Sequence, residues 1–235
     1  MERVLDQLCG KLRAAFSDRL VSVVLYGSAA AGDHTRYSDL NILCVLTRFT
    51  PVEMKESEAI FRWWRELGNP SPLLLTEEEV RTSTDCFAVE FHDIKDRHRI
   101  LTGKDVIADL SVDDSFYRMQ VEHELRAKLL RLRQKASGML SDQEHLRRLL
   151  VDSISTFCVL FRHALLLHGI DADPRKREVV ARAQEAFGID ASPFEKLLDV
   201  REERAKPREL DPVAVLPAYL AGISTVIEAV DRLEK

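Results

Sequence analysis

With 235 residues, the chain is long enough for one large domain or two small ones. Its 46% hydrophobic and 31% charged residues are typical of a globular protein. The net charge of −5 at pH 7 excludes a bulk electrostatic attraction to nucleic acid, although a local basic patch stays open. The four cysteines lie scattered in apolar segments without a CxxC pair, which indicates buried reduced thiols rather than disulfides.

Neither the N-terminal segment nor the most apolar run has the pattern of a targeting or membrane-spanning segment. Residues 1–16 are charged and have helical periodicity, which is not the pattern of a signal peptide. The apolar run from Ile154 to Leu167 is interrupted by Arg162 and His163, and it is too short and too polar to span a bilayer. We therefore expect a cytoplasmic protein with no membrane partner.

The first half of the chain mixes predicted helices and strands. The segments 20–26 and 39–46 are rich in Val and Leu and are predicted to be buried strands. On the second strand Asp39, Asn41 and Leu43 share one face, because strand side chains alternate. The other elements predicted in this half are helices over 5–16 and 51–67, a short strand over 73–75, a helix capped by Thr76, a strand over 86–92 and an edge strand over 100–103.

The second half of the chain is predicted to be helical, because strand patterns vanish after about residue 110. An apolar stripe over 121–136 predicts one amphipathic helix, and the segment 146–167 is apolar on most faces, as in a central bundle helix. Asp173-Pro174 is typical of a helix start, and Gly188 of the end of that helix. Apolar residues spaced by three and four over 213–233 predict a final bundle helix.

The run LYGSAAAGDHTRYSDLNIL joins the first two predicted strands. The Gly27-Ser28 turn offers backbone N–H groups and a hydroxyl to phosphates, and glycine allows the backbone to approach a ligand closely. Asp39 opens the next strand and offers a carboxylate, the ligand type that Mg²⁺ prefers. The run therefore indicates a phosphate-holding turn beside a metal-holding carboxylate.

This run resembles the nucleotidyltransferase superfamily, which includes DNA polymerase beta, kanamycin nucleotidyltransferase and the minimal nucleotidyltransferases. The family pattern is Gly-Ser, ten residues, then Asp-x-Asp; here ten residues separate Ser28 from Asp39, but Asn41 replaces the second aspartate. The resemblance implies a small α/β domain joined to a helical bundle. We therefore predict an α+β chain with a mixed-sheet nucleotidyltransferase-like domain over 1–108 and a helical bundle domain over 109–235.

The resemblance also implies a nucleotide site. Gly27 and Ser28 match the family's phosphate turn, and Arg36 and Ser38 in the same loop are further candidates for contact with the triphosphate. The family transfers a nucleoside monophosphate from a nucleoside triphosphate, such as ATP, to an acceptor. Binding and alignment, rather than covalent chemistry, are the main demands on the protein.

The family's metal ligands are three carboxylates that hold Mg²⁺. Asp39 matches the first ligand and Asn41 takes the place of the second. Glu90, in the predicted strand FAVEFHDI, is the candidate for the third, with Asp93 as the alternative. Asp39 and Glu90 are thus the candidate catalytic residues, and we expect Asp39, Asn41 and Glu90 to face one cleft. An amide offers only a neutral oxygen to a cation, so Asn41 should weaken metal binding.

Two functional hypotheses follow. The first is an enzyme that binds NTP·Mg²⁺ and transfers a nucleotidyl group to a hydroxyl of a small molecule, protein or RNA. The second is a noncatalytic nucleotide-binding or antitoxin-like regulator that has lost full metal-dependent activity, which Asn41 favours. Neither hypothesis names the acceptor, and whether the chain forms a homodimer stays open.

The helical half holds two further patterns. Arg162 and His168 have a spacing that resembles the Arg-x(4–6)-His element of HEPN ribonucleases, although a histidine at a helix end also satisfies backbone carbonyls. Five cations lie close together on one predicted helix and form either a solvated face or a phosphate-contacting surface: Arg126, Lys128, Arg131, Arg133 and Lys135.

Overall fold

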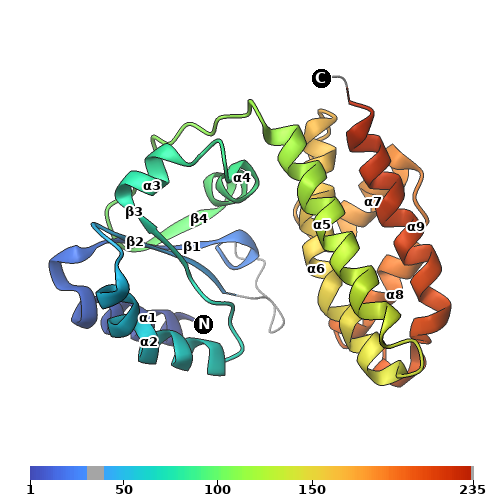
Figure 1. The fold of residues 1–235 in the computed structure, drawn as a ribbon, viewed down its shortest axis with the longest axis horizontal. Helices are drawn as coiled ribbons and strands as arrows, with labels where there is room; N and C mark the ends of the chain where they lie inside the picture. Colours follow the sequence, from blue (N-terminus) through green and yellow to red (C-terminus); the bar gives the residue numbers. More distant parts are fainter. Residues whose placement is uncertain (31–39, 234–235) are drawn as a thin grey trace. The chain divides into compact units, whose positions relative to one another are not determined.

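The chain is described from a computed structural model, which covers residues 1–30 and 40–233. It divides into two compact units, Met1–Phe116 and Tyr117–Lys235 (Figure 1). The predicted domain boundary between residues 108 and 109 falls in the segment that connects the last strand of the first unit to the first helix of the second.

A four-stranded mixed sheet forms the centre of the first unit. Its order is β3-β2-β1-β4, where β1 is Leu20–Tyr26, β2 is Asn41–Leu46, β3 is Leu73–Thr76 and β4 is His98–Gly103. Strand β1 is antiparallel to both β2 and β4, whereas β2 and β3 are parallel. The sheet confirms the predicted mixed-sheet fold, with β4 as the predicted edge strand.

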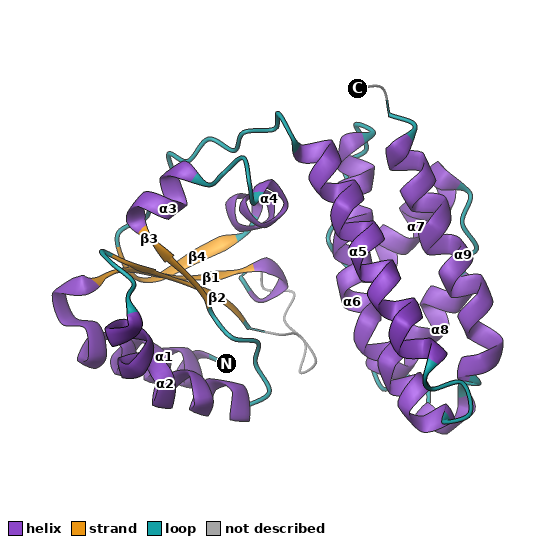
Figure 2. Cartoon of the chain, in the orientation of Figure 1, coloured by secondary structure: helices purple, strands orange, loops and turns teal. Residues whose placement is uncertain are grey.

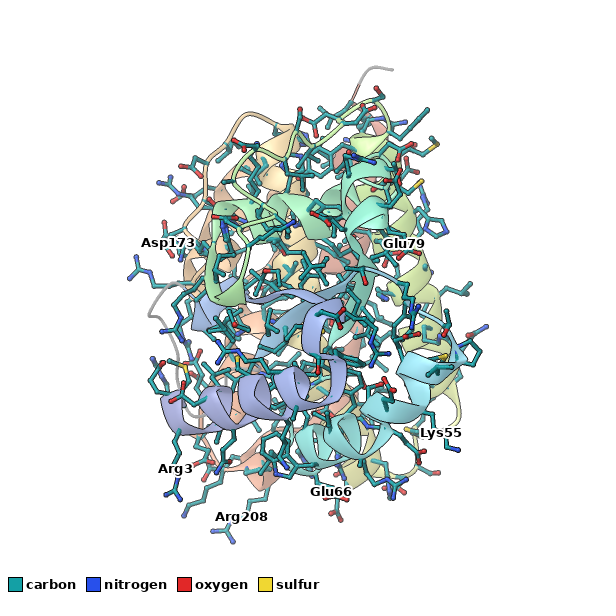
Figure 3. The ribbon with its side chains drawn as sticks, turned by 90° about the vertical axis from the view of Figure 1, so that its left-hand side faces the viewer. Arg3, Lys55, Glu66, Glu79, Asp173 and Arg208 are labelled. Carbon is teal, nitrogen blue, oxygen red and sulfur yellow. The ribbon has the colours of Figure 1, made fainter. Side chains whose placement is uncertain are left out.

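Helices cover both faces of this sheet (Figure 2). Helices α1 (Glu2–Phe16) and α2 (Pro51–Glu66) lie on one face, and α3 (Glu77–Thr82) and α4 (Ala88–Asp96) lie on the other. A short 3₁₀ turn, η1 (Ser17–Arg19), connects α1 to β1. Polar side chains of α1 and α2 such as Arg3, Lys55 and Glu66 point away from the sheet (Figure 3).

Alternation along the strands divides the core between the two faces. Ile42 and Cys44 of β2 pack with α1 and α2, whereas Leu43 of the same strand packs with Phe91 and Ile94 of α4. Because both faces are buried, the ends of the strands are the part of the sheet that remains for binding.

The predicted strand over 86–92 is wrong, because residues 88–96 form helix α4. The alternation of Phe87, Val89 and Phe91 suggested a strand, but Phe87 is half-exposed and the buried residues include Ala88, Phe91 and Ile94, spaced by three. A short apolar run is compatible with both the two-residue period of a strand and the 3.6-residue period of a helix. As a result, Glu90 lies on a helix that packs on the sheet and not on a strand within it.

The second unit is all-helical, as predicted. Its helices are α5 (Tyr117–Ser137), α6 (Gln143–Leu167), α7 (Lys176–Phe187), α8 (Ser192–Arg201) and α9 (Pro212–Asp231), with a 3₁₀ turn, η3 (Pro207–Glu209), before the last. Gly188 ends α7 with φ 72°, as predicted, but α7 begins at Lys176 and not at Pro174. The carboxylate of Asp173 instead accepts a bond from the Arg175 N–H in the preceding turn.

Among the described residues, α6 and α9 are long and apolar enough to cross a membrane by length and composition. Their most apolar windows are 56% and 44% buried inside the protein. Helix α6 packs against α5, α7, α8 and α9, so burial in the bundle accounts for its apolar character.

A buried carboxylate fixes the start of α2. Glu53 has no exposed surface; it accepts bonds from the Thr50 N–H and hydroxyl and pairs with Arg19 at 2.7 Å and with Arg48 at 3.1 Å. The Thr50 hydroxyl bond first, and then the two guanidinium groups, lower the pKa of Glu53 to about 2 despite its burial.

Replacing this carboxylate should give a pH-dependent loss of stability. The lowered pKa means that Glu53 stabilises the fold fully above its ordinary pKa of 4.5 and loses this contribution as the pH falls toward about 2. We expect Glu53→Gln to lower the melting temperature at neutral pH, and the difference from wild type to shrink toward pH 2. Glu58→Gln, at an exposed pair with Arg62 on the same helix, is the control that should change little. A difference that stays constant with pH would contradict this assignment.

Candidate nucleotide site

The candidate site lies at the end of the sheet where β1 stops. Tyr26, the last residue of β1, is paired with Asn41 at the start of β2 and with His98 at the start of β4. The N–H of Gly27 donates to the carbonyl of Arg97 at 3.0 Å, which extends this pairing by one bond. Three strands therefore hold the Gly27 turn in place.

Gly27 adopts a conformation that side chains disfavour. Its φ is 76°, in the left-handed region, and it opens the 3₁₀ turn η2 (Gly27–Ala29). A Cβ added at Gly27 would lie 3.3 Å from Nδ2 of Asn41, so the Asn41 amide lies directly against the turn. Both the backbone angle and the contact with Asn41 favour glycine at the position of the predicted phosphate turn.

Several predicted site residues lie outside the described part of the chain. These are Arg36, Ser38 and Asp39, together with the side chain of Ser28, whose backbone is part of η2. Their nucleotide-binding and metal-binding roles stay predictions. Asn41 and Glu90 are the members of the predicted ligand set that the structure places.

Asn41 and α4 lie on the same side of the sheet. Asn41 shares a strand face with Leu43, which packs with α4, and Tyr26 packs in the same cluster. Glu90 and Asp93 are three residues apart on α4, so they lie on one helix face. Burial first, and then the charges of Glu90 and Asp93, raise the pKa of Tyr26 to about 12. The Tyr26 phenol therefore stays protonated beside two carboxylates.

The described residues do not form a metal site by themselves. No group of three His, Cys, Asp or Glu side chains that could hold a metal ion occurs within residues 1–30 and 40–233. Asn41 contributes a neutral amide, and Glu90 approaches from a helix instead of the predicted strand. A three-ligand site would therefore depend on Asp39.

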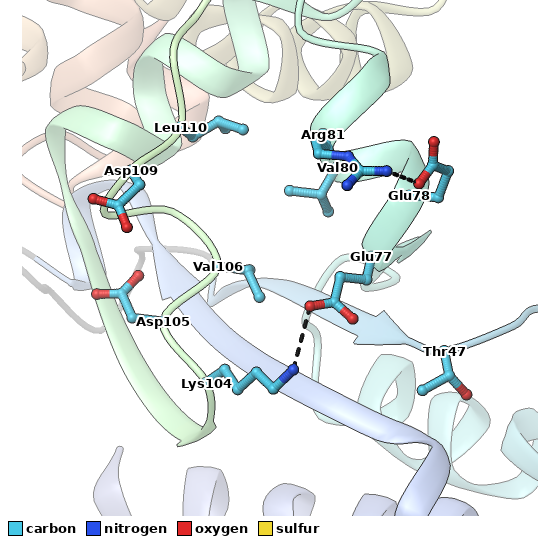
Figure 4. A pocket seen from close by; sticks show the side chains of 10 residues that line it. All are labelled: Thr47, Glu77, Glu78, Val80, Arg81, Lys104, Asp105, Val106, Asp109 and Leu110. Carbon is cyan, nitrogen blue, oxygen red and sulfur yellow. Dashed lines mark hydrogen bonds and ion pairs between the residues drawn. The ribbon is translucent and has the colours of Figure 1, made fainter.

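A hollow of about 490 Å³ lies at the end of the sheet opposite to the Gly27 turn (Figure 4). Thr47, Glu77 and Lys104, which directly follow β2, β3 and β4, contribute to its lining. Glu77 pairs with Lys104 at 3.4 Å across it. Gly27 and Asn41, the residues of the nucleotidyltransferase pattern that the structure describes in full, do not line this hollow, so we do not assign the nucleotide to it.

The HEPN-like pair of the helical unit bonds to the backbone. Arg162 is buried and its Nε donates to the carbonyl of Ala172 at 3.3 Å. His168 Nδ1 lies 2.8 Å from the carbonyl of Ala164. These bonds agree with the structural role that a histidine at a helix end can have.

Tyr26 was not identified from the sequence as a site residue, and Asp93 was named only as the alternative to Glu90. The spacing of three residues between Glu90 and Asp93 could have indicated Asp93, because in a helix this spacing places both side chains on one face. Tyr26 immediately precedes Gly27, but its proximity to these carboxylates depends on the packing of α4 on the sheet, which no local pattern reveals.

The fold and the Gly27 turn together define a nucleotidyltransferase-type domain. Residues 5–96 match the family described as "Nucleotidyltransferase domain". The N-terminal unit, Met1–Phe116, therefore carries the part of the chain that is similar to this family.

Solved structures extend the likeness to the helical unit. Spectinomycin adenyltransferase AAD(9) from Enterococcus faecialis, solved with ATP and spectinomycin, matches with a TM-score of 0.62 and 12% identity, over 95% of this chain and 99% of that one. At this identity the match shows the fold alone. A toxin-antitoxin structure with AMP-PNP matches 43% of this chain and 73% of that one, with 19% identity and a TM-score of 0.30, too low to support an argument. A comparison with curated protein sequences gave no match.

The contact between the Gly27 turn and Asn41 can be tested with Gly68 as a control, because Gly68 also has a positive φ but has no neighbour near an added Cβ. Gly27→Ala and Gly68→Ala each place a side chain at positive φ, and each should cost roughly 1–2 kcal/mol of unfolding free energy in a denaturant titration. Nothing lies within 4 Å of a Cβ added at Gly68. Only Gly27→Ala should therefore shift the NMR signals of the Asn41 side-chain NH₂. Unshifted signals would show that the amide does not contact the turn.

Proposed function

We propose that the protein binds a nucleoside triphosphate as its Mg²⁺ complex at the Gly27 end of the sheet and transfers the nucleoside monophosphate to a hydroxyl acceptor. The acceptor oxygen attacks the α-phosphorus, the bond to the bridging oxygen of the β-phosphate breaks, and pyrophosphate leaves. The proton of the hydroxyl passes to a base. Bound Mg²⁺ neutralises charge on the triphosphate.

One observation carries this proposal. In a chain whose N-terminal unit is similar to the nucleotidyltransferase domain family, Gly27 turns in the left-handed region at the end of β1, with Asn41 of the Asp-x-Asn pattern against it. Backbone N–H groups that such a turn leaves unbonded suit a phosphate chain, although the N–H of Gly27 itself bonds to Arg97. ATP is the first nucleotide to test, because the spectinomycin adenyltransferase of similar fold was solved with ATP.

Glu90 is the candidate base at this end of the sheet, with Asp93 as its neighbour. Both lie close enough to Tyr26 to affect the pKa of its phenol. The protonated phenol can donate a hydrogen bond to a carboxylate or to a phosphate oxygen. These three side chains would form the wall of the site on the α4 side.

Asn41 supports a second candidate function, a nucleotide-binding protein without efficient transfer. The amide removes one negative charge from the family's ligand set. The triphosphate oxygens can still bind Mg²⁺ with one or two carboxylates, so nucleotide binding survives this change better than activation of the acceptor. We therefore expect ATP binding with slow transfer.

Calorimetric titration with ATP, with and without Mg²⁺, tests the binding site. Asp39→Ala should weaken Mg²⁺-dependent ATP binding by about tenfold or more, the effect of roughly 1.4 kcal/mol. Asn41→Asp should strengthen it. Asp109→Asn is the matched control, because Asp109 lines the hollow at the opposite end of the sheet. Equal affinities for all four proteins would exclude a metal–triphosphate site at the Gly27 end.

Release of pyrophosphate from ATP separates the two functions. With a panel of hydroxyl acceptors, wild type should release pyrophosphate slowly and Asn41→Asp faster, because the added carboxylate restores the family's charge. Glu90→Gln should abolish the release while ATP binding persists. Binding of ATP without release by wild type or Asn41→Asp would favour the noncatalytic function.

A further inference from the structure

Helices α5 and α6 enclose a groove of about 210 Å³ within the helical unit. Its floor includes Leu132 and Phe157, which are almost fully buried. The Phe157 ring is fixed by an edge-on contact with Tyr219, with centroids 5.9 Å apart. The groove is therefore formed by packed core residues and does not depend on exposed loops.

Cations line the α5 side of this groove. Lys128, Arg131 and Lys135 lie three and four residues apart, on one face of the helix. Lys128 pairs with Glu124 at 3.3 Å, but Arg131 and Lys135 form no ion pair with any residue in the described part of the chain. Arg131 and Lys135 thus line the groove without a direct ion-pair partner among the described residues.

The α6 side carries one acid, Asp152, and two residues with hydroxyl groups, Ser153 and Thr156. Asp152 is partly compensated by Arg148 at 3.8 Å. The hydroxyl of Ser153 donates to the Leu150 carbonyl and contacts Tyr219, so it is already engaged. Thr156 has an exposed hydroxyl at the rim. The lining side chains therefore hold three positive charges and one negative charge, in a protein whose net charge is −5.

We propose that this groove binds a small phosphate monoester whose body is apolar. The net charge of the lining matches a phosphate monoester, which carries about −1.5 to −2 at pH 7. Arg131 can bind two phosphate oxygens at once, and Lys135 supplies a second point charge. The apolar body would rest on Leu149, which lines the groove and is partly exposed, above the floor formed by Leu132 and Phe157.

The size and chemistry of the groove select among anions. At roughly 30 Å³ for each water, the groove holds about seven waters, which suits a phosphate with a short body and not a polymer. A single-stranded nucleic acid would need exposed aromatic rings for stacking, and Phe157, the aromatic residue that lines the groove, is buried in its floor. Every lining residue belongs to the helical unit, so binding in this groove does not depend on the proposed nucleotide transfer.

Calorimetric titration of the full chain with phenyl phosphate tests this proposal. We expect saturable binding that weakens by at least about tenfold in the double variant Arg131→Gln/Lys135→Gln, because each lost charged bond is worth roughly that factor. Arg133→Gln is the control from the same helix, since Arg133 bonds to Ser224 and does not line the groove. This control should bind like wild type.

Two further probes separate charge from apolar contact. Phenol should not bind, and inorganic phosphate should bind more weakly than phenyl phosphate. The double variant Arg131→Lys/Lys135→Arg keeps both charges and should retain binding. Equal binding of phenyl phosphate to wild type and to the glutamine double variant would overturn the proposal, as would the absence of saturable binding to wild type.

Discussion

The antiparallel pairing of β1 with β2 is the constraint on which the candidate site depends. It sets Tyr26 opposite Asn41 and leaves Gly27 to turn immediately beyond them. A slip of one residue in this register would exchange the two faces of β2. Asn41 would then face α1 and α2, on the side of the sheet opposite to Glu90 and Asp93 of α4.

Burial on both faces of the sheet explains where binding can occur. Apolar residues from β1 and β2 pack against α1 and α2 on one side and against α3 and α4 on the other. Polar chemistry is thereby excluded from the faces and moved to the strand ends. Helix α4 then has two roles: Phe91 and Ile94 anchor it in the core, while Glu90 and Asp93 approach Tyr26.

The elements that were predicted correctly have strong local patterns. Strands β1 and β2 are rich in Val and Leu, and α2 begins at the capping box formed by Thr50 and Glu53. The helices of the second unit show long apolar stripes. In these segments propensity, period and capping all favour the same structure, and the tertiary contacts agree with these local preferences.

The errors have equally physical causes. The segment around Glu90 is short enough for its apolar residues to fit either a strand or a helix, and only packing of Phe91 and Ile94 on the sheet decides between them. Helix α8 was not predicted because it spans about three turns, over which a stripe such as Phe194, Leu197 and Leu198 is hard to recognise. The predicted site could be placed only in part, because Asp39 lies outside the described residues and the contact of Tyr26 with α4 is tertiary.

The Asn41 substitution gives this site its particular character. The amide lies against the Gly27 turn, where a second carboxylate would repel a bound triphosphate unless a metal ion neutralised it. A neutral side chain at this point lowers the demand for metal during nucleotide binding. It also reduces the charge available to hold a metal, so the amide should favour metal-free nucleotide binding and disfavour both Mg²⁺-dependent binding and transfer.

The central claim is that a nucleoside triphosphate binds at the Gly27 end of the sheet, and NMR mapping of backbone amides tests it most directly. Titration of ATP with Mg²⁺ into the labelled protein should shift the amide signals of Gly27, Ser28 and Asn41. The amides of Thr47, Glu77 and Lys104, at the opposite end of the sheet, should keep their positions. Shifts confined to that opposite end, or no shifts at either end, would contradict the assignment of the nucleotide to the Gly27 turn.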